Sequence, residues 1–216
     1  MRIRSKPWAK DELNNCYFFE KQPEKYRGIW SSRFNNKNPI NLELGCGKGV
    51  FVAKIADLHP EINFIAIDIK IDILGIAKRN IEELFDQKKV NNIVLVQKNI
   101  EQINDIISKE DNIERVYINF CNPWPRGKHQ KRRLTHTRLL LKYKQFLKSG
   151  VKIYFKTDDD DLYNSSFRYF KEANYKIIKY TDDLHSNNIF IENFTTEHEE
   201  MYTKEGIKIK AIIAEV

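Results

Sequence analysis

Cysteine is scarce and scattered in this chain. The three cysteines, Cys16, Cys46 and Cys121, lie far apart and form no C-x-x-C pair. This pattern excludes a disulfide framework and a cysteine zinc site. The five histidines also lack the spacing of metal ligands, so we expect no metal ion. Unpaired thiols are typical of a reducing compartment, and the sequence therefore predicts a cytoplasmic protein.

Long apolar runs are missing as well. No segment approaches the length needed to cross a bilayer, and the basic N-terminus is followed by Asp11 and Glu12 rather than by an apolar stretch. We therefore expect neither a membrane anchor nor a secretion signal. Hydrophobic residues make up 41% and charged residues 31% of the 216, which excludes a disordered or collagen-like chain. The length predicts one domain, with room for a small extension.

Acidic residues are absent from one long segment. Between Arg115 and Thr157 there are 12 Lys or Arg and no Asp or Glu, whereas the rest of the chain has 25 basic and 30 acidic residues. The whole net charge of +7 therefore comes from this segment. Such asymmetry predicts a face that binds a polyanion, and the stacking neighbours Trp124, His129 and Tyr143 favour RNA over a membrane. The alternative is a solvated helix surface.

Short apolar runs alternate with amphipathic stretches from residue 39 onward. We expect strands at 40–44, 63–68, 93–97, 115–120, 151–156, 175–180 and 208–215. We expect helices at 49–58, 71–87, 100–109, 134–148 and 160–173. This alternation predicts an α/β fold in which helices cover both faces of a mostly parallel sheet. Because no convincing helix separates the last two strands, one of them should run antiparallel.

The first 38 residues are polar and aromatic and have no clear periodicity. We expect an N-terminal arm over 1–38, with a short helix near 22–33, and one folded domain over 39–216. In a parallel sheet, ligands bind beyond the carboxyl ends of the strands. Motifs that lie far apart in the sequence should therefore meet at that edge.

A glycine loop follows the first of these strands directly. Gly45, Gly47 and Gly49 allow a tight turn, and a helical pattern begins at once after them. The third glycine lies two residues after the second, whereas the dinucleotide fingerprint requires glycine at position 50, which is Val50. No Ser or Thr follows Lys48, so a phosphate-binding P-loop is excluded too.

Two acidic residues flank this loop. Glu43 precedes the first glycine by two residues, and Asp68 ends the next strand, where a carboxylate can accept hydrogen bonds from both ribose hydroxyls. This arrangement resembles the S-adenosylmethionine site of seven-strand methyltransferases, and a cationic sulfonium suits acidic neighbours better than a phosphate-bearing dinucleotide does. Asn99 then stands where it could hold the adenine edge. The alternatives are a glycine turn that only connects strand to helix, and an ordinary loop asparagine.

An unusual motif follows the fourth strand. The chain reads NFCNPWP at 119–125, and prolines on both sides of Trp124 stiffen the turn. Residues 122–134 resemble the D-P-W-P-K-x-R-H-x-K-R-R-L signature of the tRNA (guanine-N7)-methyltransferases. The segments FKTD at 155–158 and TEHE at 196–199 agree with that family, so the resemblance runs from about residue 28 to the C-terminus.

This resemblance implies a Rossmann-like, seven-stranded methyltransferase fold that moves a methyl group from S-adenosylmethionine to N7 of a guanine in the tRNA variable loop. It implies no obligatory protein partner and leaves monomer and homodimer open. The donor-binding candidates are Glu43, Gly45, Gly47, Gly49, Asp68, Asn99 and Asn122. The substrate-binding candidates are Trp124, Arg126, Lys128, His129, Lys131, Arg132, Arg133, Asp158, Thr196, Glu197, His198 and Glu199. The catalytic candidates are Asn122, Asp158 and Glu197.

Three positions depart from the family signature. Its aspartate is Asn122 here, its lysine is Arg126, and the arginine before its histidine is Lys128. The last two keep the charge, whereas the first removes a carboxylate and argues against a general base at 122. Guanine N7 has a free lone pair and no proton, so alignment of the two reactants is the main requirement.

Nearby carboxylates can stabilise the cation that forms on the purine, and Asp158, Glu197 and Glu199 are the candidates. Asn122 can still orient the base or the donor through its amide. We expect residues 159–161 to cap a helix rather than to act in the site.

Two other functions remain open at this point. The NPWP segment is a possible variant of the N-P-P-Y motif of amine methyltransferases, although its aromatic residue stands third instead of fourth. The chain could also be a non-catalytic RNA-binding protein, but its glycine loop and Asp68 are intact. For Arg132 and Arg133, pairing with acidic side chains elsewhere in the fold is the alternative to contact with RNA.

Overall fold

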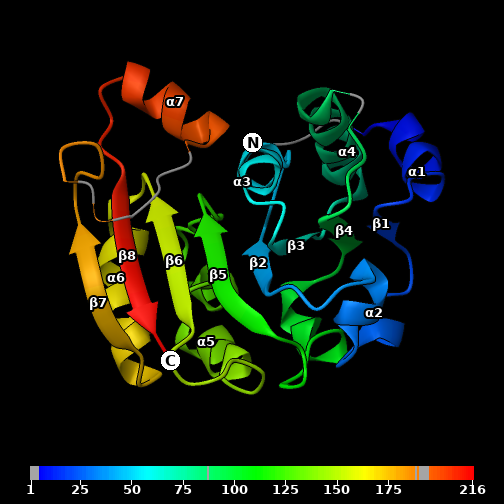
Figure 1. Ribbon diagram of the computed structural model, residues 1–216. Coiled ribbons are helices and arrows are strands. Elements are labelled where there is room, and N and C mark those ends of the chain that lie inside the picture. The colour runs from blue at the N-terminus through cyan, green and yellow to red at the C-terminus, as the bar shows by residue number, and fades with distance from the viewer. Residues whose placement is uncertain (1–4, 87, 188, 190–194) are drawn as a thin grey trace.

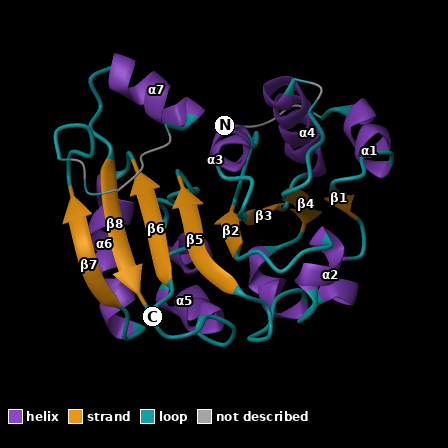
Figure 2. Ribbon diagram, viewed as in Figure 1, coloured by secondary structure: helices purple, strands orange, loops and turns teal. Residues whose placement is uncertain are grey.

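A computed structural model describes residues 5–86, 88–187, 189 and 195–216, apart from the side chains at 197, 198 and 200. One sheet of eight strands runs through it, with helices on both faces (Figures 1 and 2). The strands are β1 (Phe19–Glu20), β2 (Ile40–Leu44), β3 (Asn63–Asp68), β4 (Ile93–Gln97), β5 (Ile113–Asn119), β6 (Lys152–Thr157), β7 (Lys176–Thr181) and β8 (Lys210–Glu215). Their order in the sheet is β1-β4-β3-β2-β5-β6-β8-β7.

The helices alternate with these strands along the chain. The α-helices are α1 (Pro7–Asn14), α2 (Trp30–Phe34), α3 (Val50–Leu58), α4 (Ile71–Phe85), α5 (Thr137–Tyr143), α6 (Asp160–Glu172) and α7 (Glu197–Lys204). The 3-10 helices are η1 (Pro23–Tyr26), η2 (Ile100–Asp105) and η3 (Gly127–Arg132). No helix in the described ranges is both long and apolar enough to span a membrane.

The predicted α/β fold is confirmed. Strands β1, β4, β3, β2, β5 and β6 are parallel to one another, and β8 is antiparallel to both β6 and β7. The expected antiparallel strand is therefore present as β8. The predicted count of seven strands is one too few, because the two-residue strand β1 adds to the edge of the sheet beside β4.

Alternate residues of the strands pack into two cores on opposite faces. Leu42 and Ile65 belong to the core covered by α2, α5 and α6, whereas Ala66 and Tyr117 belong to the core covered by α1, α3 and α4. This period of two follows from the pleat of a strand. The strands are apolar on both sides because helices cover both faces of the sheet.

Several predicted helices differ from the structure. The segment 100–109 begins with the 3-10 helix η2 instead of an α-helix, and the predicted helix over 134–148 is shortened to α5. The expectation that no helix separates the last two strands is wrong, because α7 lies between β7 and β8. The expected capping role of Asp159 is confirmed, since its carboxylate accepts the N–H of Leu162 at 2.7 Å.

The N-terminal segment is packed against the rest of the chain. Trp30 is fully buried, and its indole N–H donates to the carbonyl of Ile106 at 2.7 Å. Leu13 and Phe18 are buried in the core beneath α3 and α4. The division of the chain at residue 38 stays a prediction.

Four polar side chains stand on one face near the carboxyl ends of four neighbouring strands. Glu43 is in register with Ala66 on β3 and with Tyr117 on β5, so it points to the face covered by α3. Asp68 and Asn119 stand two residues beyond these partners and therefore share that face. Lys156 is in register with Asn119. The sheet thus presents a row of polar groups in the order β3, β2, β5 and β6.

Candidate active site

The glycine loop folds back onto the next strand. The backbone N–H groups of Gly45 and Cys46 both donate to the carbonyl of Ile67, at 2.8 and 3.0 Å. Gly49 then begins α3 at a φ of +71°, and a Cβ at that position would lie 2.8 Å from the Cβ of Ala77 on α4. Only glycine meets both the backbone requirement and the close approach of α4.

Asp68 joins this loop to β3. Its carboxylate accepts the N–H of Gly47 at 3.1 Å and the N–H of Lys70 at 3.0 Å. Burial raises the pKa of Asp68, and these backbone hydrogen bonds oppose that shift. The structure therefore brings together the predicted ribose acid and the predicted glycine loop.

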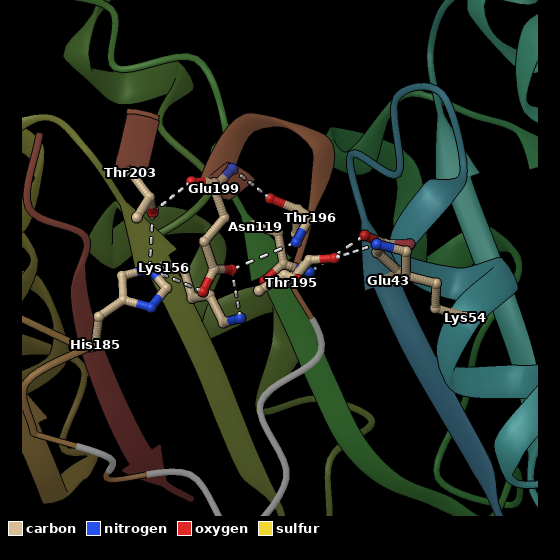
Figure 3. Close-up of polar contacts among 9 residues, drawn as sticks. All are labelled: Glu43, Lys54, Asn119, Lys156, His185, Thr195, Thr196, Glu199 and Thr203. Atoms are coloured by element: carbon tan, nitrogen blue, oxygen red, sulfur yellow. Dashed lines mark hydrogen bonds and ion pairs between the residues drawn. The ribbon is translucent and has the colours of Figure 1, made fainter. Parts of the chain in front are cut away.

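Glu43 is buried next to the loop, where β2 meets β5. Burial raises its pKa to about 8, the hydrogen bond from Asn119 opposes this shift, and the charge of Asp68 adds to it. The charge of Lys156 and the amide of Val52 at the start of α3 also lower the pKa. The amide of Asn119 donates to Oε1 of Glu43 at 3.2 Å. Figure 3 shows this pair between β2 and β5.

A buried ion pair fastens α7 to β6. Lys156 Nζ donates to Oε2 of Glu199 at 2.9 Å, and the two side chains are 3% and 0% exposed (Figure 3). Burial lowers the pKa of Lys156, and the neighbouring carboxylate opposes that shift. His185 Nε2 lies 3.5 Å from Oε1 of the same carboxylate.

The start of α7 is fixed by two further contacts. Thr196 and Glu199 form a capping box, in which the N–H of Glu199 donates to the Thr196 hydroxyl at 3.0 Å. Lys54 Nζ on α3 donates to the carbonyl of Thr195 at 3.3 Å (Figure 3). Helix α7 is therefore tied both to β6 and to the helix that follows the glycine loop.

The loop after β5 is a tight polar turn. The side-chain oxygen of Asn122 accepts the N–H of Trp124 at 3.0 Å, and Trp124 has a φ of +44°. The indole has His129 and Arg132 as neighbours. Their distances are 5.8 Å between ring centroids for His129 and 5.0 Å from the guanidinium carbon of Arg132 to the ring. An aromatic surface is thus held among cationic side chains.

Arg133 is fully buried, unlike the rest of the basic cluster. Its Nε donates to the carbonyl of Pro123 at 2.6 Å, and its Nη2 pairs with Asp161 on α6. Of the two roles set out above for this residue, the structure contains the pairing with an acidic side chain. The exposed members of the cluster are Arg126, Lys128, Lys131 and Arg132.

The glycine loop and the tryptophan loop meet at Leu134. A Cβ built on Gly45 would lie 3.4 Å from Cδ1 of Leu134, the last residue of the basic signature. The two motifs are about 90 positions apart in the chain. The edge of the sheet therefore assembles both halves of the predicted site, as expected for a parallel sheet.

The other candidates lie around this edge. Asn99 is exposed at the end of β4 and caps η2 by accepting the N–H of Glu101 at 3.0 Å. Asp158 follows β6, and its carbonyl accepts from Lys210 at 3.1 Å. The side chains of Glu197 and His198 lie outside the described part of the structure. Within the described residues, no group of three or more His, Cys, Asp or Glu could hold a metal ion.

Three further residues at this edge of the sheet are not among the candidates predicted from the sequence. Asn119 and Lys156 are the polar ends of otherwise apolar strands, and Tyr202 is on α7 with its ring centroid 6.1 Å from that of Phe120. Burial and the charge of Asp158 raise the pKa of Tyr202. The signal available in the sequence was the two-residue spacing that places Tyr117 and Asn119 on one face of β5.

The family model described as "Putative methyltransferase" matches residues 37–212. A tRNA (guanine-N(7)-)-methyltransferase of Clostridium botulinum is 54% identical over 216 residues, covering 99% of this chain and 98% of its own. One from Ruminiclostridium cellulolyticum is 51% identical over 100% of this chain and 92% of its own. The chain belongs to the tRNA (guanine-N(7)-)-methyltransferase family. A third member, from Acetivibrio thermocellus, is 45% identical over 217 residues.

Solved structures support the fold of this family member. The 16S rRNA methyltransferase KamB aligns with a TM-score of 0.59 at 12% identity, over 100% of this chain and 96% of its own. A 16S rRNA (adenine(1408)-N(1))-methyltransferase with cosubstrate SAM aligns with a TM-score of 0.57 at 13% identity, over 91% and 92%. At such low identity the likeness demonstrates a shared methyltransferase fold.

Proposed function

We propose that the protein transfers a methyl group from S-adenosylmethionine to N7 of a guanine in the tRNA variable loop, giving 7-methylguanosine. The observation that carries this proposal is the close approach of Leu134 to Gly45, because it brings the basic signature next to a donor-type glycine loop. Relatives of the same length with this activity in their names support it. An amine methyltransferase of the N-P-P-Y type, acting on RNA or protein, would leave the basic signature at 126–134 and the segment 196–199 unexplained.

The donor site consists of the glycine loop and its acidic neighbours. We assign donor contacts to Glu43, Gly45, Gly47, Gly49, Asp68, Asn99 and Asn122. Bound S-adenosylmethionine supplies an electrophilic methyl group on a sulfonium. The unpaired buried oxygen of Glu43 fits a cationic ligand, and Asp68 retains lone pairs for ribose hydroxyls beside its two backbone partners.

On the acceptor side, the chain has to position a base rather than remove a proton. Asn122, Asp158 and Glu197 are assigned to the reacting guanine: the amide of Asn122 orients it, and the two carboxylates stabilise the positive charge that develops on the ring. Guanine N7 attacks with its own lone pair, so the exchange of aspartate for Asn122 is compatible with catalysis. Alignment alone can remove several kcal/mol, on the order of 7–11, from such a barrier.

The remaining proposed contacts with tRNA are of two kinds, contacts with bases and contacts with phosphates. Trp124 offers a stacking surface, and stacking of one base on an aromatic ring contributes about 1–3 kcal/mol. The phosphate contacts are assigned to the exposed or half-buried members of the basic cluster, namely Arg126, Lys128, His129, Lys131 and Arg132. Thr196, His198 and Glu199 are assigned to the same substrate face through α7. Glu199 pairs with Lys156 and the buried Arg133 pairs with Asp161, and these pairs support a positioning role for Glu199 and Arg133.

The protein is proposed to act on tRNA without an obligatory protein partner, as a monomer or a homodimer in the cytoplasm. Three buried free thiols support a reducing compartment. Transfer of labelled methyl groups to unmodified tRNA, followed by cleavage specific for 7-methylguanosine, tests the function. Cleavage at one variable-loop guanine is expected. Label in an amine, or no label despite binding of both substrates, would refute the proposal.

A further inference from the structure

Two buried acceptor atoms face the donor site without partners. Within the described residues, Oε2 of Glu43 and Oδ1 of Asn119 make no hydrogen bond, although their residues are only 3% and 8% exposed. The other atoms of these groups bond to each other, with 3.2 Å between Asn119 Nδ2 and Glu43 Oε1 (Figure 3). That bond fixes which atom of the amide is left over, namely the oxygen.

A buried acceptor without a partner costs about 1–3 kcal/mol, and more when it is charged. A ligand that donates to both atoms would remove this cost. A primary ammonium group has three donors and no acceptor, and it carries the charge that a carboxylate favours. The unpaired atoms therefore favour a cationic nitrogen over a phosphate or a carboxylate, which offer only acceptors when ionised.

The position of Glu43 and Asn119 in the sheet indicates which part of a ligand carries this ammonium group. Glu43 lies two residues before Gly45 at the end of β2, and Asp68 lies on the far side of the same loop at the end of β3. In the proposed function, Asp68 takes the ribose of S-adenosylmethionine. The amino-acid part of the donor then extends across the loop toward β5, where Asn119 stands.

We propose that Glu43 and Asn119 together bind the α-ammonium group of S-adenosylmethionine, so that Asn119 is a donor-binding residue of this protein. The inference rests on the proposed function, since it takes S-adenosylmethionine as the donor. It adds a contact from β5, the strand that also carries the Asn122 loop. The strand thereby holds the donor with one asparagine and the acceptor base with another.

Binding of two related compounds tests this role by calorimetry. S-adenosylhomocysteine carries the amino-acid group, whereas 5′-methylthioadenosine has the same nucleoside and thioether without it. Asn119→Ala is expected to lower the affinity for S-adenosylhomocysteine about 10- to 100-fold, which is the range of a hydrogen bond to a charged group. The affinity for 5′-methylthioadenosine should stay within about twofold of that of the unaltered protein. Equal losses for both compounds, or no loss, would overturn the assignment.

Two further variants distinguish the loss of a ligand contact from a general loss of stability. Glu43→Gln keeps the size and the bond with Asn119 but removes the charge, and it should show the same selective loss. Asn41→Ala is the matched control, because Asn41 is 1% exposed, also has an unpaired carbonyl oxygen and stands nearer the amino end of β2. A selective loss in Asn41→Ala would contradict the proposal. If the unaltered protein bound neither compound, the proposed function itself would fail.

Discussion

Lys156 and Glu199 form a buried ion pair across 2.9 Å, and this pair joins the end of β6 to α7. The helix has few apolar side chains, so the pair, the capping box and the contact of Lys54 with Thr195 hold it in place. Placing two charges in a low-dielectric interior stabilises the protein only while both are present. The proposed substrate face on α7 therefore depends on one residue of the sheet.

Removing one partner of this pair should destabilise the protein strongly. Lys156→Met and Glu199→Leu are each expected to lower the free energy of unfolding by about 3–5 kcal/mol, because each leaves an uncompensated buried charge. The double variant should lose less than the sum of the two, and urea denaturation measures this coupling. Additive effects would mean that the pair does not couple β6 to α7.

Substitutions of the two adjacent arginines, Arg132 and Arg133, should have different effects: one should lower RNA binding and the other should lower stability. Arg133→Ala removes a buried side chain that holds Pro123 and Asp161, and a loss of about 2–4 kcal/mol in the free energy of unfolding is expected. Arg132→Ala alters an exposed side chain and should change stability by less than about 0.5 kcal/mol.

The binding of tRNA gives the complementary measurement for this pair. Arg132→Ala should lower the affinity for tRNA. It should also reduce the slope of log affinity against log salt concentration by about 1, as expected for the loss of one phosphate contact. Binding of S-adenosylhomocysteine should be unchanged. If Arg132→Ala unfolded the protein as readily as Arg133→Ala does, the assignment of the exposed side chain would be wrong.

Asp68→Ala should lower the affinity for the methyl donor and leave the affinity for tRNA unchanged. The variant loses the proposed ribose contact and releases the N–H of Gly47, and hydrogen bonds to charged groups contribute about 1.5–3 kcal/mol each. A 10- to 100-fold loss of S-adenosylhomocysteine affinity is expected on that scale, at the order-of-magnitude level. Asp57→Ala, which alters an acidic residue paired with Lys88, is the control. Equal losses of donor and tRNA would contradict two separate subsites.

The affinity for the donor should rise with pH below about 8. Glu43, whose pKa is raised to about 8, holds a proton in the free protein at pH 7, and a bound ammonium favours the ionised carboxylate. Binding therefore releases a proton, and the affinity increases by up to about tenfold per pH unit until Glu43 is ionised.

Calorimetry in buffers of different ionisation enthalpy measures this proton release. The other charged groups facing Glu43 are Asp68, which raises its pKa, and Lys156, which lowers it. The ligand's own amine titrates equally in all variants, so Glu43→Gln is the control and should abolish the difference. Equal pH profiles for the two proteins would disprove the coupling.

Much of the fold was predictable from local sequence. The seven predicted strands match within about two residues because short, continuous apolar runs bounded by turn residues are distinctive. Helix α7 was not predicted, although TEHE at 196–199 has the pattern of a capping box. The buried partner of Glu199, Lys156, comes from a distant strand. Strand β1 has two residues, too few for any period.

The site was predictable where its residues belong to a motif. Glu43 and Asp68 flank a glycine loop, and their proximity to it follows from the sheet topology. Asn119 and Lys156 lie in the quoted segments NFCNPWP and FKTD, but neither was a candidate, because a polar residue at a strand end is expected to face solvent until its neighbours are known. Arg133 looked like its exposed neighbours, and only its burial distinguishes it.

The strand order has a consequence for the order of events on the ribosome. Strand β7 joins the sheet through β8, and β8 emerges from the ribosome about 30 residues later, after α7. A nascent chain that ends after β7 can build the parallel half of the sheet, from β1 to β6, but has no strand for β7 to pair with. Strand β6 is then the exposed edge of the sheet and residues 176–181 are unpaired, while the basic tryptophan loop can form before α7 is made. Cotranslational folding should therefore proceed in two stages, with the substrate face completed in the second.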